Sequence, residues 1–203
     1  MDVEQIISDL RTLYPQNFFY LRHDPFYVLI STVLSHRTRD EITYRASSRL
    51  MDKFRSAQEM AEAEVSEIEE LIKDVGFYRV KSRRVKEIAE ILMYRYGGEV
   101  PDNCELLLEL PGVGRKTANC VLLYAFSKET IAVDTHVHRI SNRLGLVKSS
   151  TPDETEEKLK KILPRSSWKD INELFVQFGQ NICRPVSPKC DICVLCNICP
   201  GLF

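Results

Sequence analysis

The first segment that could do chemistry is the stretch LPGVGRKTA at residues 110–118. Two glycines one residue apart, after a proline, permit a tight turn with positive φ and no Cβ in the way. A helix that begins there directs its first backbone N–H groups outward, which creates a site suited to a phosphate. The pattern therefore indicates a helix–hairpin–helix that binds a DNA backbone without reading base sequence, although a plain helix–helix turn is the commoner source of such a pair of glycines. Its contact residues would be Gly112, Val113, Gly114 and Arg115.

Lys116 and Asp134 are the candidate reactive side chains. A lysine in the first turn of a helix lies at the positive end of the dipole, and Arg115 beside it adds to the effect. Both favour a neutral, nucleophilic amine, although this stretch alone is more typical of a surface lysine that contacts phosphate. Asp134 follows a short apolar run, so its ordinary role is an N-cap. Capping bonds would also keep the carboxylate ionised and fixed, able to stabilise a cation that develops opposite it.

Five of the seven cysteines crowd into the last part of the chain. They are Cys183, Cys190, Cys193, Cys196 and Cys199. Such crowding argues for metal rather than disulfides. The last four form a C-x2-C-x2-C-x2-C run before a proline, which approaches an iron–sulfur run although the final gap is one residue short. Spacing alone leaves five candidates for four positions, and a four-thiolate zinc is the rival metal. Either metal would be structural.

The charge balance limits how this chain could bind nucleic acid. With 28 basic and 29 acidic residues the net charge is −1, so any basic surface must be local. The run RVKSRRVK at residues 79–86 holds five cations and no acid, although a solvated helix face is the alternative interpretation. A hydrophobic content of 44% supports a globular core, and no apolar run is long enough for a membrane span. The start, MDVEQIISDL, lacks a basic segment before an apolar core, so we expect a cytoplasmic protein.

The elements that must position these residues are predicted to be helices. Apolar spacing and capping signals predict helices over residues 4–13, 25–34, 40–54, 82–96, 104–110, 116–126, 135–144 and 168–180. Another begins at the sequence TPDE, where Thr151 is the expected N-cap and Pro152 the first helical residue. Strand alternation is absent apart from a short apolar stretch, residues 130–133. We therefore predict an all-α fold.

LPGVGRKTAN followed by AVDTH resembles the endonuclease III family of DNA glycosylases, in the helix–hairpin–helix, Gly/Pro-Asp superfamily. The cysteine tail is similar as well, and the resemblance extends at least from Pro25 to Cys199. It implies that Lys116 is the nucleophile and Asp134 the essential carboxylate. The family's C-x6-C-x2-C-x5-C pattern holds a [4Fe–4S] cluster. This pattern implies Cys183, Cys190, Cys193 and Cys199 as ligands and leaves Cys196 as a spare thiol.

The same resemblance implies two loops that fill the space left by a flipped base. Arg37 stands where many relatives carry Gln, so the opposite-base preference could differ. Phe77 matches a position that is frequently leucine, and an aromatic ring can intercalate equally well. A core residue is the alternative for Phe77. Arg79 and Lys81, in the basic run that follows, would lie along the phosphates.

Together these observations predict two helical lobes. Residues 21–128 would form a bundle that ends in the helix–hairpin–helix. Residues 1–20 plus 129–203 would form the iron–sulfur lobe, with the active site in the cleft between the lobes.

The resemblance implies an enzyme that removes oxidised or ring-damaged pyrimidines and then cleaves the strand at the abasic site. The partner would be double-stranded DNA with a damaged base or abasic site, bound by a monomer in the nucleoid. A related glycosylase for mismatched thymine or uracil, and a non-catalytic iron–sulfur DNA-binding or redox-sensing protein, are the alternatives.

Overall fold

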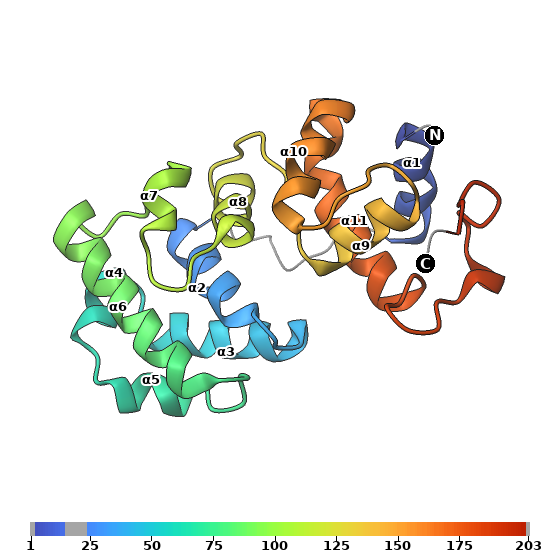
Figure 1. Cartoon of the computed structure of the whole chain (residues 1–203). Helices are drawn as coiled ribbons and strands as arrows, with labels where there is room; N and C mark the ends of the chain where they lie inside the picture. The colour runs from blue at the N-terminus through green and yellow to red at the C-terminus, as the bar shows by residue number, and fades with distance from the viewer. Residues whose placement is uncertain (1–2, 15–23, 202–203) are drawn as a thin grey trace. The chain divides into compact units, whose positions relative to one another are not determined.

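The computed structural model describes residues 3–14 and 24–201, which form helices joined by turns and loops (Figure 1). No strand occurs within those ranges, so the all-α prediction is confirmed. None of the helices found there is long and apolar enough to cross a bilayer. The α-helices are α1 (Val3–Leu13), α2 (Pro25–Ser35), α3 (Asp40–Lys53), α4 (Ala57–Glu62), α5 (Val65–Leu71), α6 (Tyr78–Tyr96), α7 (Cys104–Leu108), α8 (Arg115–Tyr124), α9 (Thr135–Arg143), α10 (Pro152–Ile162) and α11 (Trp168–Asn181). Two short 3-10 turns, η2 (Arg165–Ser167) and η3 (Cys190–Ile192), accompany them.

The described chain divides into two compact units. The hairpin unit comprises residues 24–128 and contains α2 to α8. The cysteine unit comprises residues 3–14 with 129–201 and contains α1 and α9 to α11. The lobe boundary expected at residues 20 and 21 falls within 15–23, outside the described residues.

Helices α2 and α8 form the centre of the hairpin unit. Asp24 caps α2 by accepting the Tyr27 N–H at 2.7 Å, and eight of the 11 residues of the helix are buried. Helix α8 is similarly buried, with every residue from Thr117 to Tyr124 inside the unit, and it packs along α2. A helix that is apolar on all sides needs neighbours on all sides. The hairpin that precedes α8 therefore leads directly into a helix that is buried within its unit.

Helix α6 begins earlier than the sequence pattern predicted. The predicted start was Ser82, whereas the first helical residue is Tyr78. Phe77, at φ 59°, adopts the left-handed conformation and turns the chain so that helical dihedrals start at the next residue. The basic run of residues 79–86 therefore lies wholly within α6.

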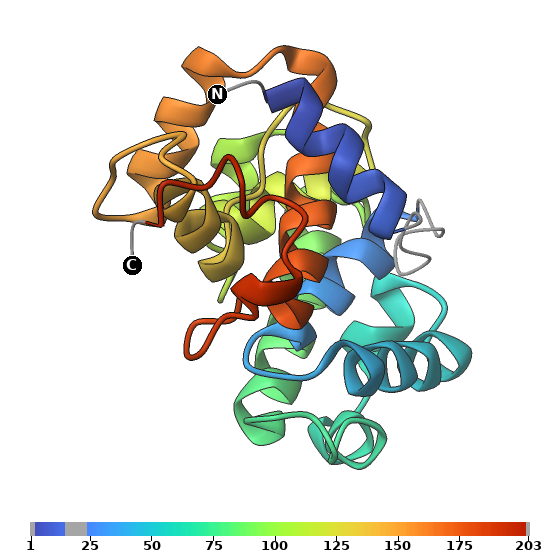
Figure 2. The ribbon, with the colours of Figure 1, turned by 90° about the vertical axis from the view of Figure 1, so that its right-hand side faces the viewer.

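The core of the cysteine unit lies between α1, α9 and α11. Ile6 and Leu10 of α1 are fully buried together with Phe175 of α11 and Leu195 of the C-terminal loop. Figure 2 shows α1 beside α11, and Arg11 on the former pairs with Asp170 on the latter at 2.6 Å. The burial of Leu195 fixes the middle of the cysteine-rich loop to this core.

The apolar stretch of residues 130–133 is buried and has no regular secondary structure, so it is not a strand. The side-chain amide of buried Asn172, on α11, donates to the carbonyl of Ala132 at 2.8 Å. This bond holds the segment that leads directly into Asp134 and α9.

Candidate functional site

The hairpin before α8 requires glycine at one of its two glycine positions, Gly112. Gly112 has φ 76°, and a Cβ placed on it would lie 2.9 Å from Cδ of Arg84. Val113 donates its N–H to the Leu110 carbonyl at 3.1 Å, which closes the turn. Gly114 is the N-cap of α8, and nothing lies within 4 Å of the position that a Cβ there would occupy. The first turn of a helix leaves N–H groups without intrahelical acceptors, so this open side is suited to a phosphate.

Lys116 is half-buried in the first turn of α8, the position that the sequence indicated. Next to it, Thr117 is 1% exposed and its hydroxyl lies 3.0 Å from Nε2 of His36. Burial lowers the pKa of His36, and the positive charges of Lys116, Lys81 and Arg84 lower it further. His36 is therefore a neutral ring at neutral pH that joins the loop after α2 to the helix bearing Lys116.

The structure brings Arg37 and Phe77 together although they lie far apart in the sequence. The guanidinium carbon of Arg37 is 5.8 Å from the centroid of the Phe77 ring, a cation–π contact. Both residues have positive φ, 52° and 59°. Phe77 is 62% exposed, which excludes the alternative that it belongs to the core. A Cβ on Gly76 would lie 2.8 Å from the Arg37 carbonyl oxygen, so the two loops are in close contact.

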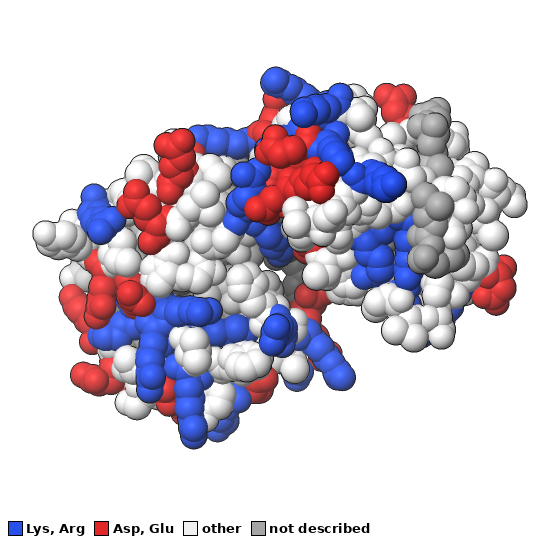
Figure 3. All heavy atoms as spheres, in the orientation of Figure 1, with Lys and Arg blue, Asp and Glu red and all other residues white. Residues whose placement is uncertain are grey.

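The basic run on α6 divides into exposed and buried members. Arg79, Arg83 and Arg84 are exposed, and Figure 3 shows Lys and Arg side chains gathered over the part of the surface where α6 lies. Lys81 is only 3% exposed and donates to three protein oxygens, so the prediction that it lies along the phosphates is wrong. Its position on the inner face of α6 directs the ammonium into the unit. Lys86 likewise donates to two backbone carbonyls.

Asp134 is the N-cap of α9, half-buried at the end of the apolar stretch. Its Oδ1 accepts the N–H groups of His136 and Val137, both at 2.8 Å. Both capping hydrogen bonds go to Oδ1, so Oδ2 takes no part in capping the helix. The carboxylate is thus held in a fixed direction by backbone donors.

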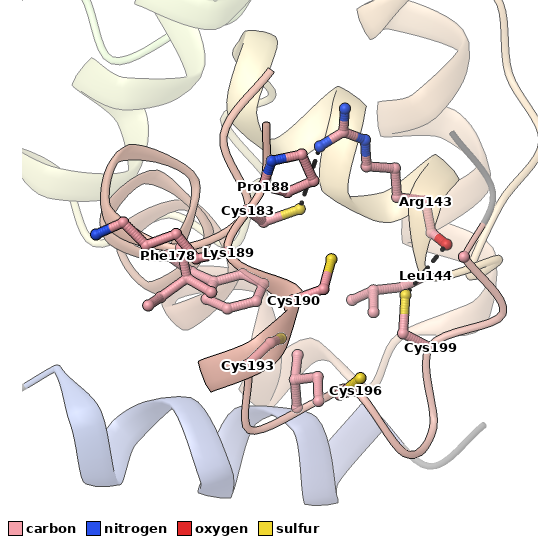
Figure 4. A pocket seen from close by; sticks show the side chains of 13 residues that line it. Arg143, Leu144, Phe178, Cys183, Pro188, Lys189, Cys190, Cys193, Cys196 and Cys199 are labelled. Atoms are coloured by element: carbon pink, nitrogen blue, oxygen red, sulfur yellow. Dashed lines mark hydrogen bonds between the residues drawn. The ribbon is translucent and has the colours of Figure 1, made fainter. Parts of the chain in front are cut away.

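The five crowded cysteines line one cavity of about 150 Å³ in the cysteine unit (Figure 4). They are Cys183, Cys190, Cys193, Cys196 and Cys199. Phe178 and Leu195 contribute apolar walls, and burial raises the pKa of the Cys193 thiol. The sulfur atoms lie around the cavity (Figure 4). Within the described residues, no three His, Cys, Asp or Glu side chains are gathered closely enough to hold a single metal ion, so the cavity would suit a larger group. An apolar cavity lined by thiols fits the donor chemistry of an iron–sulfur cluster.

Two arginines of α9 hold the start of the cysteine-rich loop. Arg139 donates to the Cys183 carbonyl at 2.8 Å and to the Gly179 carbonyl at 3.2 Å. Arg143 donates to the carbonyls of Arg184 at 2.6 Å and Pro185 at 2.9 Å. The sequence analysis did not single out this pair. Their spacing of four residues in the helix after Asp134 was the available signal, since it places both on one helix face.

Comparison with known proteins gives consistent matches over nearly the whole chain. A sequence model described as HhH-GPD superfamily base excision DNA repair protein matches residues 30–165. Endonuclease III of Thermotoga maritima is 53% identical over 197 residues, which cover 97% of this chain and 92% of that protein. Two longer relatives from Arabidopsis thaliana also match, and this chain spans 48% and 49% of their lengths.

Solved structures agree with these sequence matches. A trapped endonuclease III–DNA covalent intermediate is similar at a TM-score of 0.89 and 34% identity, over 99% of this chain and 97% of that one. A thermostable thymine-DNA glycosylase is similar at a TM-score of 0.87 and 27% identity, over 98% and 95%. The chain therefore belongs to the endonuclease III family, within the HhH-GPD superfamily of base excision DNA repair proteins.

Proposed function

We propose that this chain removes oxidised or ring-damaged pyrimidines from double-stranded DNA through a Schiff base on Lys116. Membership of the endonuclease III family makes it a base excision repair DNA glycosylase with AP lyase activity. The observation that carries the proposal is a half-buried lysine in the first turn of α8, directly after a hairpin shaped for phosphate. We propose that the chain has two domains, one of residues 21–128 and the other of residues 1–20 together with 129–203. We also propose that it is a monomer that acts on DNA in the nucleoid.

The chemistry assigns one step to each reactive group. The Nζ amine of Lys116 attacks C1′ of a flipped nucleotide, the bond from C1′ to the base breaks, and the base leaves with the electron pair and gains a proton. The sugar ring opens to a protonated Schiff base. Loss of a C2′ proton then expels the 3′ phosphate, and water releases the lysine. Asp134 stabilises the positive charge that builds on the sugar and helps to deprotonate the attacking amine.

The hairpin unit supplies the surface that holds DNA and separates its bases. Gly112, Val113, Gly114 and Arg115 would contact one phosphate through the hairpin and the start of α8. The stacked Arg37 and Phe77 would fill the space left by the flipped nucleotide. Arg79 is exposed at the start of α6 and is suited to a neighbouring phosphate.

We also propose a [4Fe–4S] cluster held by Cys183, Cys190, Cys193 and Cys199, with Cys196 as the spare thiol. The support is the family's cysteine spacing and the shared cavity that these residues line. Four thiolates leave no coordination position for substrate, so the bound cluster would supply a structural tie that closes the loop. Arg139 and Arg143 hold the first residues of that loop whatever fills the cavity.

Borohydride trapping on a duplex with one thymine glycol tests the function directly. Reduction of a Schiff base leaves a permanent crosslink, which we expect for the unmodified chain and not for Lys116→Ala or Lys116→Arg. The arginine variant is the matched control, because it keeps the positive charge but cannot form the Schiff base. Crosslinking by Lys116→Arg would overturn the assignment of the nucleophile.

Lesion identity follows from the same assay on a panel of duplexes. The similarity to a thymine-DNA glycosylase makes mismatched thymine and uracil the second substrate class to include. Base loss without a crosslink would replace the proposed bifunctional mechanism with a monofunctional one. Removal of mismatched thymine without removal of thymine glycol would contradict the proposed preference for oxidised pyrimidines. The assignment to the endonuclease III family would be unaffected.

A further inference from the structure

Lys81 has a buried ammonium group to which the proposed reaction assigns no step. It is 3% exposed on α6, and its Nζ donates to the carbonyls of Leu34 at 2.7 Å and His36 at 2.5 Å. A third bond reaches the hydroxyl of Thr38 at 3.0 Å. Burying a charge is costly unless it is fully hydrogen-bonded, so these three acceptors account for its presence there.

All three acceptors belong to the end of α2 and the loop that follows it. Carbonyls at a helix C-terminus lack intrahelical donors and carry partial negative charge, which favours a cation at this end. Two of the acceptors, His36 and Thr38, flank Arg37 on either side. The ammonium is therefore hydrogen-bonded to the residues immediately before and after Arg37.

Lys81 is also bonded to the second loop. Its backbone N–H donates to the Phe77 carbonyl at 3.1 Å, in the first turn of α6. This backbone bond is the ordinary first turn of α6, so the Lys81 side chain holds only the loop that carries Arg37. Phe77 is connected to that loop through its ring contact with Arg37, and both residues have positive φ. A left-handed conformation costs free energy for a residue other than glycine, so it persists where surrounding bonds enforce it.

We infer that Lys81 is a positioning residue that holds the Arg37–Phe77 pair ready for insertion into the base stack. This inference rests on the proposed function, because insertion matters only if a nucleotide is flipped. Lys81 itself does not contact DNA. It restrains the loop that carries Arg37, and Arg37 contacts Phe77, so less conformational entropy is lost when the pair enters the duplex.

The chain offers a matched control on the same helix. Lys86 donates its Nζ to the carbonyls of Ala61 and Ala63, both at 2.8 Å, at the end of α4. It therefore performs the same capping chemistry as Lys81 for a loop that carries neither Arg37 nor Phe77. Lys81→Met and Lys86→Met remove the same charge from the same helix but release different loops. Lys86 is also less buried and pairs with Glu90 at 3.5 Å, so Lys86→Met tests for the general effect of removing a lysine from α6.

The test uses the full chain and a duplex with 2-aminopurine opposite a non-cleavable abasic analogue. Insertion of side chains beside the orphan base changes its stacking and hence its fluorescence. We expect a clear change with the unmodified chain and with Lys86→Met, and little change with Lys81→Met at saturating protein. The preference for abasic over intact duplex should fall about tenfold in Lys81→Met only. Thermal unfolding of both variants shows that each is folded at the assay temperature.

Two results separate the failure of this inference from the failure of the proposed function. Equal fluorescence changes for Lys81→Met and the unmodified chain would overturn the positioning role. Equal losses in both methionine variants would also overturn it, because a general loss of stability would then explain them. If the unmodified chain gave neither a fluorescence change nor a borohydride crosslink, the proposed function itself would be contradicted, and with it the basis of this inference.

Discussion

The side chain of Arg84 lies directly against Gly112 in the hairpin. A Cβ at this glycine would be 2.9 Å from Arg84 Cδ, and the glycine has φ 76°. Gly112→Ala therefore combines a steric conflict with a left-handed alanine. We expect it to lower the free energy of unfolding by about 1–3 kcal/mol, measured by urea denaturation. Removing the conflict in Gly112→Ala/Arg84→Ala should recover part of this loss.

Gly114→Ala is the functional counterpart of that change. Its Cβ would meet nothing within 4 Å, and the N-cap backbone is extended, so the fold should tolerate it. The added methyl group would occupy the space in which we propose that a phosphate meets the hairpin. We expect binding to an abasic duplex to weaken about tenfold at constant salt, with unfolding unchanged. Unaltered affinity would remove Gly114 from the proposed DNA contact.

Asp134→Asn separates capping from charge. An asparagine oxygen can accept the same two N–H groups, from His136 and Val137, so α9 should keep its start. Loss of the negative charge should reduce the single-turnover rate of base removal by about a hundredfold or more. Asp134→Ala should slow the reaction similarly and also cost about 1 kcal/mol of stability, since it has no cap. A full rate in Asp134→Asn would leave this residue with a capping role alone.

Helix boundaries and cap residues were largely predictable from the sequence because their signals are local. Thr151 caps α10 through the Glu154 N–H at 3.2 Å, and Asp134 caps α9, both at the predicted positions. The start of α6 was missed because it depends on Phe77 in a left-handed conformation, which propensity disfavours in a bulky residue. Gly76 and Phe77 both contact Arg37, which is far away in the sequence, and such a tertiary contact is in no local pattern.

Charge patterns identified the basic helix but not the role of each cation. Lys81 and Arg84 have the same sign within one run, yet the former is buried and the latter lies over the hairpin. Side-chain direction on a helix changes by about 100° per residue, so only the neighbouring elements decide which cations face inward. The sequence alone could not supply those neighbours.

Cysteine variants test the proposed ligand set. Cys193→Ser should lose most of the iron and acid-labile sulfide, since it removes a proposed ligand, whereas Cys196→Ser should retain both. Cys196 lines the same cavity, so it is the appropriate control for a general effect of serine in this loop. Iron content and the visible absorption of the purified chain are the measurements. Loss of iron in Cys196→Ser with retention in Cys183→Ser would replace the proposed set with the last four cysteines.

Lys81 should make insertion of the Arg37–Phe77 pair depend on pH. Burial, with the neighbouring Arg84 charge as a second cause, lowers the pKa of Lys81 from 10.5 to about 8. Below this value the ammonium has three N–H donors for its three acceptors, whereas the neutral amine has two. The 2-aminopurine response of the unmodified chain, divided by that of Lys81→Met, should therefore fall as pH rises through about 8. Contributions from Lys116 and Arg84, which face the same loop, are present in both proteins and cancel in the ratio.

The direction in which Lys81 changes protein stability with pH distinguishes a loss of the 2-aminopurine response from unfolding of the chain. Because the pKa is lower in the folded chain, the unfolded chain binds more protons at this group between about 8 and 10.5. Stability from Lys81 is therefore smallest below pH 8 and increases as pH rises through this window. His36, whose pKa is lowered below its ordinary value of 6.5, stays neutral throughout it. If the fluorescence response ratio falls as pH rises while the stability contributed by Lys81 does not fall, the change comes from the loop and not from unfolding. A fluorescence response ratio that does not change with pH would contradict the role of the ammonium.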